Sequence, residues 1–257
     1  MNAAFLGVPA GMRAAAICGR YLARRPKSLA AARRSACATL FVFALHAQPA
    51  QVTWKFDNLD KIGGHKTSLL GHPKLIDSSV GKAIEFNGQD DGLMLDLHPL
   101  AGAATFTWEA IFRPDGGNAE QRWFHLEENP ATGDDHDNRM LFEIRVINGQ
   151  WCLDAFNKSG ALQKALLFRN KLHDLGAWYH VAAVYDGTEF RSYVNGVQEG
   201  AAQIHLAPQG EGRTAIGVRL NKVYYFKGAI HQARFTRRAL APSEFLRFPG
   251  EPHSGVY

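Results

Sequence analysis

The stretch 176–196, GAWYHVAAVYDGTEFRSYVNG, restricts the fold of this chain more than any other segment. It contains two runs rich in β-branched and aromatic residues, 178–185 and 189–194, and the first ends at DG and the second at NG. Both dipeptides tolerate the positive φ angles of tight hairpins. The first run carries apolar residues on both of its faces, as does a central strand that is covered on both sides. The stretch therefore predicts consecutive antiparallel strands inside an all-β domain.

Short runs of alternating polarity, separated by Gly, Asn, Asp and Pro, recur along the rest of the chain after residue 50. They are too many for one flat sheet, so we expect an antiparallel β-sandwich of two packed sheets. A short helix beginning at Pro242 should cover a sheet with its Leu and Phe side chains. The further candidate strands are 52–56, 82–86, 93–97, 105–113, 122–126, 139–146, 150–156, 214–218 and 228–235.

The formal net charge of +5 is concentrated at the amino terminus. Residues 1–47 hold seven of the 29 Lys and Arg residues and none of the 24 Asp and Glu residues, which leaves 22 basic and 24 acidic residues in the remainder. That remainder is therefore slightly acidic and has no surplus of cations to neutralise a phosphate backbone. We do not expect nucleic acid as a partner.

The basic leader is followed by a short apolar run, 36–47, and then by small residues. This order is typical of a secretory signal peptide, with cleavage after Ala47; a mitochondrial transit peptide and a twin-arginine signal at Arg33-Arg34 are the alternatives. The run is too short to span a bilayer, which takes about 20 residues. We expect a signal peptide over 1–47, one domain over 48–250, a tail over 251–257, and a secreted or periplasmic protein without stable membrane insertion.

Cys152 is the one cysteine outside the leader, so a disulfide within 48–257 is excluded. Its place beside Trp151 in an apolar run predicts a small buried side chain rather than a nucleophile.

Several motifs follow one another in a fixed order: GKAIEFNGQDDGLML (81–95), FTWEAIFRP (106–114), the 176–196 stretch, TAIGV (214–218), FKGAIHQARF (226–235) and RRALAPSEF (237–245). Together they resemble the laminin G-like (LamG-like) branch of the concanavalin A-like lectin/glucanase superfamily. The resemblance covers about residues 52–247 and implies a jelly-roll β-sandwich. It implies a binding module as readily as an enzyme, because folds of this kind host many functions.

The resemblance also bears on Ca²⁺, which many LamG-like domains bind through an acidic pair in the closing strand. Here His231 and Gln232 occupy those two positions, and a hard cation prefers anionic oxygens. We therefore expect no metal or other cofactor, with Ca²⁺ as the alternative. Its candidate ligands would be Asp57, which matches an early acidic position of the family, and the loop residues Asp134, Asp135 and Asp137.

Two enzymatic activities are open to this fold. Hydrolysis of a glycan needs two carboxylates on one face, but Glu109 and Glu143 each lack an acidic partner two or four residues away in their strands. EIR (143–145), QIH (203–205) and YFKGAIHQ (225–232) resemble motifs of alginate-lyase-like jelly rolls. That resemblance implies β-elimination with Arg145, His205 and His231 as the catalytic residues.

A binding surface follows more directly from the alternation in 139–146. Met140, Phe142, Ile144 and Val146 share one face, which leaves Arg139, Leu141, Glu143 and Arg145 on the other. We therefore expect an exported, non-catalytic module that binds carbohydrate, with an alginate-lyase-like enzyme and a protein-interaction module as alternatives. The expected ligand contacts are Trp123, His125, Arg139, Glu143, Arg145, Tyr224, Tyr225, His231 and Gln232.

Overall fold

The computed structural model describes residues 50–129 and 138–249, almost entirely as β-strands joined by turns. The expected signal peptide at 1–47, the tail at 251–257 and the acidic residues Asp134, Asp135 and Asp137 lie outside the described residues. Within the described ranges, none of the helical structure is long and apolar enough to cross a membrane.

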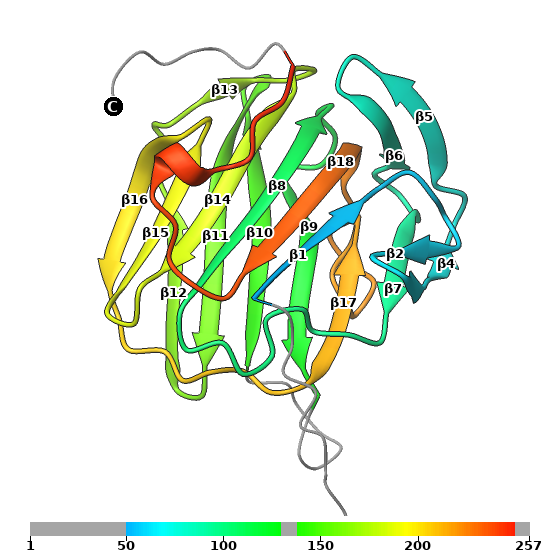
Figure 1. The fold of residues 1–257 in the computed structure, drawn as a ribbon. Coiled ribbons are helices and arrows are strands. Elements are labelled where there is room, and N and C mark those ends of the chain that lie inside the picture. The colour runs from blue at the N-terminus through cyan, green and yellow to red at the C-terminus, as the bar shows by residue number, and fades with distance from the viewer. Residues whose placement is uncertain (1–49, 130–137, 250–257) are drawn as a thin grey trace, which may run out of the picture. The chain divides into compact units, whose positions relative to one another are not determined.

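Sheet 1 has the strand order β16-β15-β14-β8-β18-β6-β5, and β1 pairs with the second half of β18 (Figure 1). Its pairings are antiparallel, and the 178–194 region forms its predicted central hairpin, β14 and β15. The strands are β1 (Gln51–Lys55), β5 (Lys74–Ser78), β6 (Gly81–Asn87), β8 (Phe106–Pro114), β14 (Tyr179–Tyr185), β15 (Glu189–Val194), β16 (Val197–Gln203) and β18 (Lys227–Thr236).

Sheet 2 has the order β12-β11-β10-β9-β17-β7-β4, with the short β13 paired to β11. Its strands are β4 (Ser68–Leu70), β7 (Gly92–Leu95), β9 (Glu120–Glu128), β10 (Arg139–Ile147), β11 (Gln150–Ser159), β12 (Leu162–Leu167), β13 (His173–Asp174) and β17 (Gly212–Ile216). A separate hairpin of β2 (Lys61–Ile62) and β3 (His65–Lys66) and the 3-10 turn η1 (Pro242–Glu244) complete the described elements.

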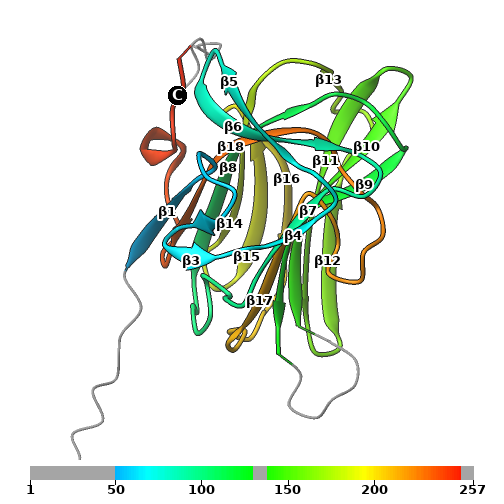
Figure 2. The same ribbon diagram turned by 90° about the vertical axis from the view of Figure 1, so that its right-hand side faces the viewer.

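The two sheets pack face to face, as the side view shows, around an aromatic core (Figure 2). Trp108 of sheet 1 lies 4.1 Å from Phe142 of sheet 2, measured between ring centroids. Phe112 of sheet 1 stacks on Trp123 of sheet 2 at 4.3 Å and 3°. Aromatic pairs of this kind stabilise a core by more than the burial of their surface area alone would. The predicted all-β, two-sheet sandwich is confirmed, and Cys152 is buried and free as expected.

Several strands were not expected, and most lie at or near sheet edges. Apart from the exposed Val197 and Leu162 at their first positions, β16 (VQEGAAQ) and β12 (LQKALL) are polar or small on their exposed positions, because an edge strand has one neighbour and much contact with solvent. Their sequences therefore lack the alternating apolar pattern that marks a half-buried strand. Gln203 of the QIH tripeptide ends β16, where we had expected a loop.

The outer face of sheet 1 is covered by the residues that follow β18, which we call the C-terminal strap (residues 239–248). Leu240 and Phe245 of the strap pack against Ala182, Val184 and Tyr193 of the sheet. This is the covering role expected for the turn at Pro242.

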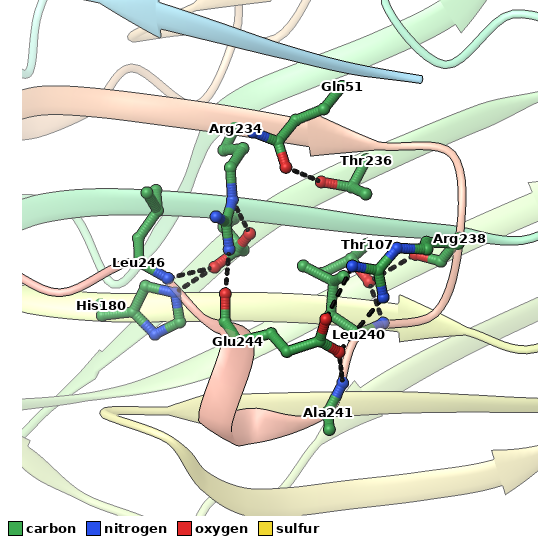
Figure 3. A network of polar contacts seen from close by, with 11 residues as sticks. Gln51, Thr107, His180, Arg234, Thr236, Arg238, Leu240, Ala241, Glu244 and Leu246 are labelled. Carbon is green, nitrogen blue, oxygen red and sulfur yellow. Dashed lines mark hydrogen bonds and ion pairs between the residues drawn. The ribbon is translucent and has the colours of Figure 1, made fainter.

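A buried carboxylate fastens the strap. Glu109 of β8 is fully buried, and it accepts hydrogen bonds from His180 (3.0 Å), Arg234 (2.5 Å) and the backbone N–H of Leu246 (2.7 Å); these three partners are labelled in Figure 3. Arg234 also donates to the carbonyl of Glu244 at 2.7 Å. Burial would raise the pKa of Glu109, but the hydrogen bonds from His180 and Arg234 outweigh it, and the pKa is lowered. Glu109 therefore carries a structural charge in sheet 1.

We expect Glu109→Gln to lower the free energy of unfolding by about 3 kcal/mol, because it leaves the Arg234 guanidinium without its carboxylate. Urea denaturation followed by tryptophan fluorescence measures the change. Glu244→Gln, which breaks the exposed pair with Arg238, is the matched control and should cost far less. Equal losses in the two variants would contradict the structural role of Glu109.

Candidate functional site

A β-bulge at Trp123 decides which side chains of β9 face outward. Phe142 of β10 pairs with Phe124, but the next residue, Glu143, pairs with Arg122. Trp123 is therefore the extra residue, and both it and Phe124 point into the core. The bulge leaves Arg122 free to join the outer face beside Glu143.

The outer face of sheet 2 contains a shallow groove of about 250 Å³, which we call the arginine groove. Four arginines and two carboxylates surround a small apolar floor. Its lining residues are Arg122, Arg139, Leu141, Glu143, Arg145, Asp154, Phe156, Ala165 and Arg219. The predicted division of 139–146 is confirmed, because Arg139, Leu141, Glu143 and Arg145 line the groove while Met140, Phe142 and Ile144 lie in the core.

Two carboxylates meet in the groove across neighbouring strands. Glu143 of β10 is directly opposite Asp154 of β11. The Nη2 of Arg145 donates to both, at 2.9 Å to Glu143 and 2.7 Å to Asp154. Arg122 donates to the other oxygen of Glu143 at 3.1 Å. Since Glu143, Arg145 and Asp154 are all buried, these polar side chains hold one another in fixed positions.

Asp154 is the carboxylate of this cluster that has an unsatisfied oxygen. Its Oδ1 is buried and has no hydrogen-bond partner among the described residues. Burial, and next the charge of Glu143, raise the pKa of Asp154 to about 6 in spite of the opposing charges of Arg145 and Arg122. A buried acceptor without a donor is costly in a folded protein and is often satisfied by a ligand or water.

Arg219 of the groove lining belongs to the segment 217–226 between β17 and β18, which lies on the outer side of sheet 2 (Figure 2). Gly217 begins it at φ +79°, where a Cβ would overlap the ring of Phe86. The carbonyl of Tyr224 accepts from the N–H of Arg122 at 2.9 Å, so the segment is attached to β9.

Tyr224 has an unusual conformation for an exposed tyrosine. Its φ is +59°, a region that non-glycine residues rarely occupy, and Lys222 in the same turn has φ +61°. The Arg122 guanidinium lies 3.6 Å from the centroid of the Tyr224 ring, which remains 41% exposed. Strained backbone held in this way is found most often at functional sites. The segment thus presents an aromatic ring beside the groove.

His125 lies on the same face but is covered. Its Nδ1 accepts from the N–H of Leu220 at 3.1 Å, and its Nε2 lies 3.3 Å from Glu127. Burial lowers the pKa of His125. The expected ligand contact by His125 is wrong, because a fully buried imidazole that holds the 217–226 segment has no surface for a ligand.

Four other residues expected to contact ligand lie away from the groove. Trp123 is in the aromatic core, because the bulge turns it inward. His231 and Gln232 lie on β18 in sheet 1, and the Nδ1 of His231 donates to the carbonyl of Lys82 at 2.7 Å. Tyr225 is half-buried and does not line the groove. Arg139, Glu143 and Arg145 are brought together there, with Tyr224 at its edge.

The residues expected for a lyase do not converge. Arg145 lies on the outer face of sheet 2, His231 in sheet 1, and His205 is exposed beyond the end of β16. The structure therefore provides no joint site for these three side chains.

Asp57 is exposed, and in the described ranges no three His, Cys, Asp or Glu side chains gather closely enough to hold a metal ion. This part of the chain therefore offers no Ca²⁺ site built from such a cluster.

Arg122, Asp154 and Arg219 are groove residues that sequence reasoning missed. Asp154 was hidden because its acidic partner comes from the neighbouring strand, and only the register of β10 and β11 reveals the pair. The outward position of Arg122 depends on the bulge, and the position of Arg219 depends on the path of a loop.

The sequence profile of the concanavalin A-like lectin/glucanases superfamily matches residues 87–245, more than half of the chain. This chain belongs to that superfamily. The match covers every strand of the arginine groove, so the groove is part of the superfamily domain. No curated protein sequence matches the chain.

Solved structures share the fold of this superfamily member at low identity. Domain 4 of AbnA, a GH43 extracellular arabinanase from Geobacillus stearothermophilus, aligns with a TM-score of 0.59 and 20% identity over 75% of this chain and 94% of its own. The binding domain of Paraclostridial Mosquitocidal Protein 1 aligns at 0.55 and 14%, over 76% and 50%. The binding domain of botulinum neurotoxin serotype D aligns at 0.55 and 12%, over 75% and 48%. This chain thus spans about half of each toxin domain, and these likenesses establish the fold.

The raised pKa of Asp154 predicts how the free energy of unfolding depends on pH. A carboxyl whose pKa is higher in the folded state favours folding most below pH 4, and this contribution is lost as pH rises through 6. Asp154→Asn cannot titrate, so its free energy of unfolding should gain about 3 kcal/mol relative to wild type between pH 4 and 7. Urea titrations at several pH values measure the difference, with the exposed Asp77→Asn as the control. Parallel profiles for wild type and Asp154→Asn would contradict it.

Proposed function

We propose that this protein is an exported, non-catalytic module that binds carbohydrate in the arginine groove. The observation that carries the proposal is the groove itself, in which buried, mutually fixed charged groups lie beside an exposed aromatic ring. A sugar ring presents hydroxyl groups at its edge and C–H groups on its faces. It therefore matches a site that combines a few well-placed polar groups with an aromatic surface.

The polar groups of the groove suit hydroxyl recognition. Within the described ranges, Asp154 Oδ1 lacks a donor, and Arg122 Nη1 and Arg145 Nε have no hydrogen-bond acceptor, although they lie 3.6 and 3.9 Å from the carboxylate of Glu120. Charge-assisted hydrogen bonds are stronger than neutral ones, and a rigid template reduces the entropy lost on binding. The groove is shallow and open along sheet 2, so a chain of sugar units could cross it without its ends being enclosed.

The fold relatives support a binding function. The AbnA domain was solved in complex with arabinotriose, and the two toxin domains are binding domains. Export rests on the signal-peptide pattern of residues 1–47. A protein ligand in the same groove is the alternative outcome of the experiment that follows.

A glycan array probed with residues 48–257 should show selective binding. Tyr224→Ala should weaken that binding about tenfold, since stacking on an aromatic ring contributes on the order of 1 kcal/mol or more. Val223→Ala, which trims the exposed neighbouring side chain, is the matched control and should bind as wild type does. Failure of the folded protein to bind any glycan would overturn the proposal and favour a protein ligand.

We also propose that binding requires no Ca²⁺, because His231 and Gln232 replace the family's acidic pair. The melting temperature and the glycan affinity should be unchanged by Ca²⁺ or by a chelator. A large rise in melting temperature on adding Ca²⁺ would contradict this expectation.

A further inference from the structure

The charges that line the arginine groove are unbalanced. It has four guanidinium groups, on Arg122, Arg139, Arg145 and Arg219, and two carboxylates, on Glu143 and Asp154. Both carboxylates are already engaged by Arg145, and Glu143 also by Arg122. Arg122 and Arg145 also lie 3.6 and 3.9 Å from the Glu120 carboxylate, and Arg139 has contacts of its own, so the excess of positive charge falls to Arg219.

Arg139 and Arg219 differ in the contacts that their side chains make. The Arg139 guanidinium lies 5.2 Å from the centroid of the Phe156 ring. In the part of the chain that the structure describes, the side chain of Arg219 makes neither a hydrogen bond nor an ion pair. Arg219 is half-buried and belongs to the 217–226 segment, whose backbone is attached to β9. A partly desolvated cation without a partner, on a backbone that is attached to the sheet, is a ready site for an anion.

This positive region is local rather than a reflection of the whole domain. Residues 48–257 contain 22 basic and 24 acidic residues, so the domain carries a slight negative charge. A hollow lined by one sign of charge concentrates the electrostatic field and attracts ligands of the opposite sign.

We infer that the ligand of the arginine groove is an acidic glycan, with Arg219 binding a carboxylate or sulfate group on one of its sugar units. This inference rests on the proposed carbohydrate function and narrows its ligand class. The guanidinium group can form two parallel hydrogen bonds with either anion. The Glu143–Arg145–Asp154 cluster would contact the hydroxyl groups of the same chain.

The test uses two pairs of polymers that share a backbone and differ in charge: polygalacturonate with its methyl ester, and dextran sulfate with dextran. The affinity of residues 48–257 should be at least tenfold higher for the charged member of one pair, and the difference should shrink as salt is raised. The polymer pair that shows this difference in affinity identifies the bound group as a carboxylate or a sulfate. Equal binding within both pairs, or binding of neutral glycans alone on the array, would overturn the inference and leave the proposed function standing.

Arg219→Gln should reduce the preference for the charged polymer about tenfold, so that the charged and neutral polymers bind almost equally. The melting temperature should be unchanged. Lys222→Gln removes the same charge from an exposed position of the same segment and is the matched control. It should keep the preference. Equal losses in both variants would mean that the attraction is diffuse and not centred on Arg219, and would overturn the assignment. Absence of binding to every glycan would instead remove the proposed function.

Discussion

The aromatic layer between the two sheets is the interaction on which the rest of this structure depends. Trp108 contacts Phe142 and Phe112 contacts Trp123 across the sandwich, while Trp123 packs on Phe142 within sheet 2. These rings fix the distance and register between the sheets. Because a protein interior packs at nearly crystalline density, each of these rings fits in a single position. The bulge in β9 follows from this demand, since it puts both Trp123 and Phe124 into the layer.

The same bulge creates the polar site on the opposite side of the sheet. A regular β9 could not direct Arg122 and His125 outward while Trp123 and Phe124 both point inward. With the bulge, Arg122 pairs with Glu143, and His125 holds the loop that carries Arg219. Core packing and the candidate binding site are therefore two consequences of one extra residue. Such bulges are common next to functional sites because they redirect side chains.

The outer faces of the two sheets serve different purposes. Sheet 1 is covered by the C-terminal strap, which Glu109 fastens through His180, Arg234 and the backbone of Leu246. Sheet 2 leaves its charged face open as the arginine groove. Both faces contain buried carboxylates, but Glu109 has every partner it needs, whereas Asp154 has an oxygen without a donor. The filled hydrogen-bond positions of the Glu109 carboxylate indicate a structural role for that residue, and the unfilled position on Asp154 is what suggests a ligand.

The sequence by itself determined the all-β sandwich, its central hairpin and the two faces of 139–146, because alternation of period two and turn dipeptides are local properties. It also placed Arg139, Glu143 and Arg145 on one surface. Tertiary structure alone decided that Asp154 joins them, that Trp123 turns inward, and that His231 and Gln232 belong to the other sheet. Those outcomes depend on strand register, a bulge and sheet order, which arise from packing between segments far apart in the chain and leave no local pattern.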